Sequence, residues 1–102
     1  KAWHLHKKMT LNYAVIYGTI KLVLYDDRPD SPTQGHVEEF ILSATENYSL
    51  ITVPPLIWNG FQGIDERDSI VANCATLPYE PDEIERKSYD DQSIPYTWEQ
   101  NS

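Results

Sequence analysis

The chain has 102 residues, a net charge of −8 from 16 acidic and 8 basic side chains, and 40% hydrophobic residues. This length predicts one small domain, residues 1–102, which buries only about 60–65% of its unfolded surface and so depends on tight packing or on a partner. The net negative charge argues against nucleic acid and anionic membranes as partners, because both bind basic surfaces.

Cys74 is the only cysteine, so no internal disulfide is possible, and no apolar run approaches the roughly 20 residues that span a bilayer. These features predict a protein of the reducing cytoplasm. The sequence begins at Lys1 without a signal-peptide pattern, and we expect that a further N-terminal segment precedes it in a longer natural protein.

Short β-rich runs separated by turn residues recur along the sequence, whereas a helical period of 3.6 is hard to find over any useful length. The first run, residues 2–9, places His4 and His6 on one face and Trp3 and Leu5 on the other, because successive strand side chains point opposite ways. Two histidines are therefore predicted to face the same space.

Two alternating runs follow, at residues 11–17 and 20–25, and Gly18 between them is predicted to be a hairpin turn. Residues 26–35 contain two prolines, a glycine and several short polar side chains, which predicts a surface loop.

Three further strands are predicted, at residues 37–42, 50–53 and 69–76, the last of them as a core strand. The remaining segment, 77–102, is rich in proline, acids and tyrosine, and residues 81–86 are compatible with one short helical turn. We interpret the acidic run 80–91 as solvated surface. About six short strands at near-regular spacing predict an all-β sandwich or barrel, of which a jelly roll is one form.

Three motifs carry a resemblance to a known family. Trp3-His4-Leu5-His6 comes first, the loop Asp26-x-Arg28-x-x-Ser31-Pro32-Thr33-x-Gly35 second, and Pro54-Pro55-Leu56-Ile57-Trp58-Asn59-Gly60-Phe61 third. In this order and at these separations they resemble the dTDP-4-dehydrorhamnose 3,5-epimerase family of small cupins. Tyr79-Glu80-Pro81, Asp91 and Trp98 extend the resemblance to nearly the whole chain. It implies a single all-β cupin domain, a jelly-roll β-barrel or sandwich.

The resemblance implies an epimerase that acts on a nucleotide-linked 4-keto-6-deoxy sugar. In such a reaction a base removes the acidic proton beside the ketone, and a cationic or hydrogen-bonding group stabilises the enolate. The family's Arg-Gly-Leu-His motif aligns with residues 1–4, which makes His4 the base and Lys1 the residue that binds the nucleotide phosphate. Histidine suits this task because its ordinary pKa is about 6.5.

The expected substrate-binding residues are Lys1, His6, Asn59, Asn73 and Tyr79. By the resemblance, Asn59 replaces the family's second histidine and Asn73 replaces its proton-donating tyrosine, while Leu11 stands where the family has an enolate-stabilising lysine. Neither asparagine delivers a proton at pH 7. Two hypotheses therefore stay open: a slow epimerase that depends on His4, and a catalytically impaired cupin that binds a nucleotide sugar without epimerising it.

A metal centre is a further possibility, because cupins often bind a divalent metal through a His-x-His motif such as His4-Leu5-His6. Thr10 or Leu11 and Asn59 stand where the remaining Glu and His ligands belong, so we expect neither a metal nor another cofactor. A homodimer is expected, because so small a β domain has open sheet edges to cover and relatives exchange edge strands.

Overall fold

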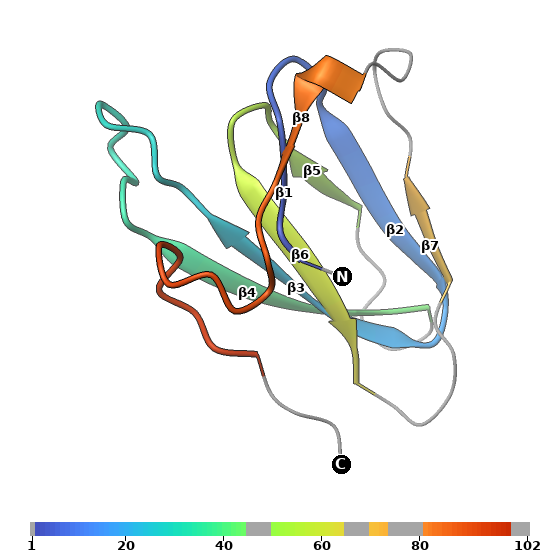
Figure 1. Cartoon of the computed structure of the whole chain (residues 1–102). Helices are drawn as coiled ribbons and strands as arrows, with labels where there is room; N and C mark the ends of the chain where they lie inside the picture. Colours follow the sequence, from blue (N-terminus) through green and yellow to red (C-terminus); the bar gives the residue numbers. More distant parts are fainter. Residues whose placement is uncertain (1, 45–49, 65–69, 74–80, 99–102) are drawn as a thin grey trace.

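The computed structural model describes residues 2–44, 50–64, 70–73 and 81–98. Its elements are β1 (His4–His6), β2 (Leu11–Tyr17), β3 (Thr19–Tyr25), β4 (Val37–Ser43), β5 (Ile51–Val53), β6 (Trp58–Gly63), β7 (Ile70–Asn73), the 3-10 helix η1 (Pro81–Glu83) and β8 (Ile84–Arg86) (Figure 1). Within these ranges there is no helix long and apolar enough to cross a membrane.

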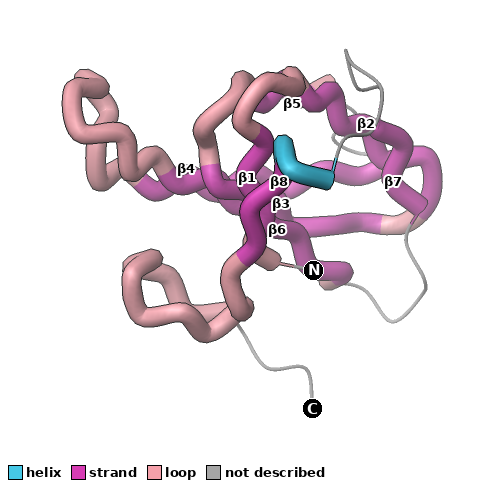
Figure 2. The backbone as a smooth tube through the Cα atoms, turned by 45° about the horizontal axis from the view of Figure 1, so that its top comes forward, coloured by secondary structure: helices cyan, strands magenta, loops and turns pink. Residues whose placement is uncertain are grey.

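The strands form two antiparallel sheets that face each other. One has the strand order β4-β3-β6-β1-β8 and the other the order β5-β2-β7. Figure 2 shows the strands as two layers, with the loop between β3 and β4 projecting from one end. The predicted all-β jelly-roll class is confirmed, in the form of a sandwich rather than a closed barrel.

The predicted hairpin at Gly18 is wrong. β2 pairs with β5 and β7, whereas β3 pairs with β4 and β6, so the strands on either side of Gly18 belong to different sheets. Gly18 has a φ of 81°, a conformation open mainly to glycine, and it carries the chain from one sheet to the other. Alternation along a strand predicts its two faces but says nothing about its partner.

Strand β6 lies at the centre of the five-stranded sheet, between β3 and β1, and the sequence did not reveal it. Asparagine and glycine are poor strand formers, and three of the six residues of β6 are of these types. Gly60 is required by packing: a Cβ there would lie 2.6 Å from the Cβ of Ala2 and 2.9 Å from a ring carbon of Trp98.

Two other expectations about the second half of the chain need correction. Only residues 81–83 of the predicted helical turn are helical, and residues 84–86 form strand β8. The described part of the predicted strand 69–76 is β7, an edge strand whose Ile70 is 54% exposed, rather than a core strand.

Each face of the five-stranded sheet has its own apolar cluster, because β1, β3 and β6 send alternate side chains to opposite sides. The inner cluster, between the sheets, includes Leu11, Leu22 and Leu42. The outer cluster consists of Trp3, Leu5, Val23, Trp58 and Ile94, with Tyr96 and Trp98 packed against it. The C-terminal segment therefore closes the outer face, and the histidine side of β1 faces the inside of the sandwich.

The loop that carries the second motif is held by one buried carboxylate. Asp26 is 5% exposed and accepts hydrogen bonds from the Arg28 guanidinium, at 2.9 Å to each oxygen, and from the hydroxyls of Ser31 and Thr33. These bonds, above all those from Arg28, hold the pKa of Asp26 far below its ordinary value. The motif thus has a structural role, in which Arg28 joins the loop to Asp26.

Candidate functional site

The candidate site is a cavity of about 270 Å³ between the two sheets. Strands β1 and β8 form one wall, where His4 lies opposite Arg86. Strands β2 and β7 form the other, where Tyr13 lies opposite Asn73. The lining residues are His4, His6, Tyr13, Phe61, Val71, Asn73, Ile84 and Arg86.

Of the residues predicted from the sequence, His4, His6 and Asn73 line this cavity. Asn59 is buried, with 1% exposure, and joins the two walls: its amide Nδ2 donates to the carbonyl oxygen of His4 at 3.1 Å, and its Oδ1 accepts the hydroxyl of Tyr13 at 2.9 Å. The predicted contacts Lys1 and Tyr79 lie outside the described residues, as does Cys74.

Tyr13 was missed as a site residue. Tyr13 is 8% exposed, and burial raises the pKa of its phenol to about 12, so the hydroxyl keeps its proton at neutral pH. The alternation of residues 11, 13 and 15 does indicate that Tyr13 points inward, but a tyrosine among apolar residues of a strand is usually interpreted as part of the hydrophobic core. Tyr13 thus lines the cavity on the wall opposite His4 with a protonated phenol, whose hydroxyl donates to Asn59.

His6 has a buried acidic partner that was also missed. Its Nδ1 lies 2.8 Å from Oε2 of Glu83, whose Oε1 accepts the backbone N–H groups of Lys8 at 2.9 Å and Met9 at 2.8 Å. Burial is the largest influence on the pKa of Glu83 and raises it, but the hydrogen bonds from Lys8, His6 and Met9 outweigh burial and keep the pKa below its ordinary value. Glu83 therefore stays ionised although it is only 3% exposed.

A cationic side chain also reaches the cavity. Arg86 pairs across the strands with His4, and directly opposed residues of an antiparallel pair share a face. Leu11, which stands in place of the expected lysine, is 1% exposed within the inner cluster and offers no charge. Arg86 thus places a positive group beside His4 in a chain whose net charge is −8.

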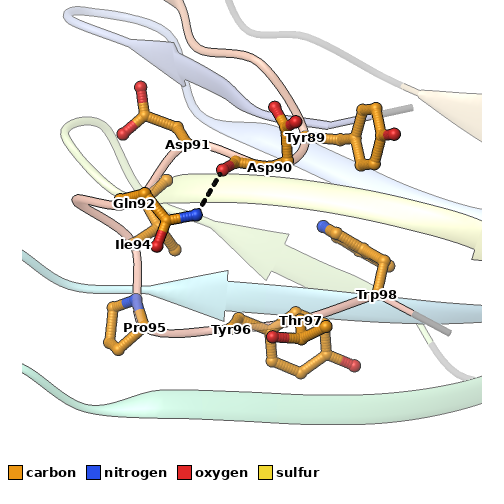
Figure 3. Close-up of a pocket in the computed structure, with 9 residues that line it drawn as sticks. All are labelled: Tyr89, Asp90, Asp91, Gln92, Ile94, Pro95, Tyr96, Thr97 and Trp98. Carbon is orange, nitrogen blue, oxygen red and sulfur yellow. Dashed lines mark hydrogen bonds between the residues drawn. The ribbon is translucent and has the colours of Figure 1, made fainter.

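A second cavity, of about 370 Å³, lies within the C-terminal segment (Figure 3). All nine residues that line it come from positions 89–98. Some of their polar groups form hydrogen bonds within this segment, such as the 3.1 Å bond from the Gln92 amide to the carbonyl oxygen of Asp90. It is larger than the cavity lined by His4 and His6, called here the histidine cavity. However, no side-chain type in its lining has an ordinary pKa near 7. Proton transfer near neutral pH is therefore better served by the histidine cavity.

Metal binding has little support at either cavity. Among the residues that the structure describes, no three His, Cys, Asp or Glu side chains converge as a metal site would require. That the protein needs no metal stays a prediction.

Comparison with known proteins gives consistent matches. The sequence model of the dTDP-4-dehydrorhamnose 3,5-epimerase family matches residues 3–102. The chain is 40% identical over 102 residues to a "Probable low-salt glycan biosynthesis epimerase" of Haloferax volcanii, covering 96% of the chain and 64% of that protein. It is 29% identical over 100 residues to a spore coat polysaccharide biosynthesis protein of Bacillus subtilis, covering 96% of the chain and 66% of that protein.

Several solved structures share this fold. A dTDP sugar isomerase from Desulfovibrio desulfuricans superposes with a TM-score of 0.94 at 41% identity, covering 96% of this chain and 62% of that one. A dTDP-4-dehydrorhamnose 3,5-epimerase from Bacillus anthracis, with TDP and PPi bound, gives a TM-score of 0.83 at 28% identity, covering 97% of this chain and 57% of that one. The chain thus spans less than two thirds of the length of each of these relatives.

Proposed function

Since the chain belongs to the dTDP-4-dehydrorhamnose 3,5-epimerase family, we propose that it acts on a nucleotide-linked 4-keto-6-deoxy sugar by abstracting a proton next to the ketone. The observation that carries this proposal is the placement of His4 and Tyr13 on opposite walls of one cavity. Inversion at a carbon needs a base on one face and a proton donor on the other, and this pair offers both.

Each lining group has a role in this scheme. His4 accepts the carbon-bound proton, Tyr13 donates a proton to the opposite face, and Arg86 stabilises the negative charge on the enolate oxygen. Asn73, across the strand pair from Tyr13, donates an amide hydrogen bond to the sugar. Asn59 positions both reacting groups through its bonds to the His4 carbonyl and the Tyr13 hydroxyl.

A relative supports the proposal that the substrate carries a nucleotide. The Bacillus anthracis epimerase was solved with TDP and PPi bound. In the present chain Lys1 remains the predicted contact for the nucleotide phosphate, and Tyr79 remains a predicted substrate contact. A cytoplasmic location and a homodimer also remain predictions. The dimer would cover the outer strands of the two sheets, β4 and β8 in one and β5 and β7 in the other.

A second candidate function is binding of the nucleotide sugar without epimerisation, and the amides at Asn59 and Asn73 favour it because neither transfers protons at pH 7. Incubating the protein with a dTDP-4-keto-6-deoxyhexose in deuterated water separates the two candidates. An epimerase incorporates deuterium at C3 or C5 above the protein-free rate. A binding protein shows heat of binding in calorimetry and no incorporation, which would refute the proposed enzyme.

A further inference from the structure

The hydrogen bonds around Glu83 determine which ring nitrogen carries the proton when a second histidine of the cavity, His6, is neutral. An ionised carboxylate only accepts hydrogen bonds, so the 2.8 Å contact places the proton of a neutral His6 on Nδ1. The other ring nitrogen, Nε2, then carries a lone pair. His6 lines the cavity, so this imidazole is prepared to accept a proton there.

His4 and His6 are two residues apart on β1, which separates their Cα atoms by roughly 6.6 Å along the strand. The proposed substrate has acidic carbons on both sides of its ketone. Two imidazoles side by side on one wall thus give a bound sugar two candidate bases rather than one. His6 has a charged partner that is itself fixed by two backbone N–H groups.

We propose that His6, oriented by Glu83, is a second proton-transfer group of this cavity, beside His4; this inference rests on the proposed function. Nε2 of His6 accepts the proton from a carbon beside the ketone, and the C–H electron pair forms the enolate double bond, with the charge on the ketone oxygen. Glu83 stabilises the imidazolium, and Tyr13 protonates the opposite face of the carbon. Water then returns a proton to Tyr13 while the imidazolium releases its proton to solvent, so the protein is unchanged.

Glu83→Gln tests the orientation of the ring. The amide oxygen of a glutamine can keep the bonds from Lys8 and Met9, while its NH₂ group faces Nδ1 of His6 and forces the proton onto Nε2. Glu85→Gln is the matched control, because Glu85 lies two residues away on β8 with its side chain 53% exposed and paired with Lys7 at 3.8 Å. His6→Asn removes the base itself.

The assay follows deuterium incorporation at C3 and C5 of a dTDP-4-keto-6-deoxyhexose separately, and ¹⁵N NMR reports the tautomer of His6. We expect His6→Asn and Glu83→Gln to slow incorporation at one carbon or both by about 10²-fold, the lower range for a general base, and Glu85→Gln to match the parent. In the parent the proton should lie on Nδ1, and in Glu83→Gln on Nε2.

Three results would overturn the inference. If the parent incorporates deuterium and both variants keep its rates at both carbons, His6 is no proton-transfer group, while the proposed function stands. If Glu83→Gln loses activity with an unchanged tautomer, Glu83 acts only through the fold. If the parent incorporates no deuterium, the proposed function fails and this inference fails with it.

Discussion

Replacing Tyr13 with phenylalanine separates the structural from the chemical contribution of its hydroxyl. The hydroxyl donates a 2.9 Å bond to Oδ1 of Asn59, a residue that is 1% exposed. Its loss leaves a buried amide oxygen without its phenol donor, which costs about 1–3 kcal/mol in the free energy of unfolding. For a domain of this size each kcal/mol lowers the melting temperature by about 4–8 °C.

The chemical effect of Tyr13→Phe is larger and of a different kind. His4 can still remove a proton and return one to the same face, so deuterium should continue to enter the sugar while inversion falls by about 10²–10⁴-fold, the usual contribution of a proton donor. Tyr17→Phe, a change on the same strand at a residue 45% exposed, is the matched control. Incorporation and inversion are measured together by proton NMR in deuterated water.

Inversion at the parent rate by a folded Tyr13→Phe protein would show that Tyr13 is not the proton donor. The alkaline stability curve gives an independent check. The pKa of Tyr13 is raised to about 12 in the folded protein, against about 10 when unfolded. Its contribution to stability is therefore complete below pH 10 and is lost as the pH rises through 12, and this loss should be absent from the Tyr13→Phe variant.

Three stability predictions follow from the backbone and from the loop. Gly60→Ala should destabilise the fold by about 1–3 kcal/mol in thermal denaturation, because the new Cβ would lie 2.6 Å from that of Ala2; an unchanged melting temperature would contradict the packing described. Leu56 has a φ of 69°, so Leu56→Gly relieves a strain of about 1–2 kcal/mol and should raise the urea midpoint, whereas Leu56→Ala should not. Asp26→Asn should destabilise the fold by about 1.5–3 kcal/mol at pH 7 through weaker bonds to Arg28. Since the folded pKa of Asp26 is depressed, its contribution is present above pH 4 and falls as the pH drops further, so parent and variant should converge in acid.

The sequence predicted the local features of this fold well and the long-range ones poorly. Alternation placed His4 and His6 on one face of a strand, and the loop motif around Asp26 predicted a surface loop. Strand β6 was missed because its stability comes from pairing with β3 and β1, which overrides the weak strand propensity of its Asn and Gly residues.

In the candidate site, too, the features that the sequence did not predict depend on long-range contacts. The hydrogen bond from Tyr13 to Asn59 joins residues 46 apart, and that from His6 to Glu83 joins residues 77 apart. No local pattern distinguishes Glu83 from its acidic neighbours or Tyr13 from a core tyrosine. The Tyr13 bond depends on how the two sheets meet, and the Glu83 bond depends on the pairing of β1 with β8, so both roles become visible only in the folded structure.

In the proposed reaction, His4 abstracts a carbon-bound proton from a nucleotide-linked 4-keto sugar. The most direct measurement is the rate at which the C3 and C5 proton signals of a dTDP-4-keto-6-deoxyhexose disappear in deuterated water, with the parent protein and with His4→Asn at equal concentration. We predict that the parent accelerates this exchange and that His4→Asn lowers the exchange rate at C3, at C5 or at both by at least about 10²-fold. Equal rates for the two proteins at both carbons would contradict a role for His4 as the base.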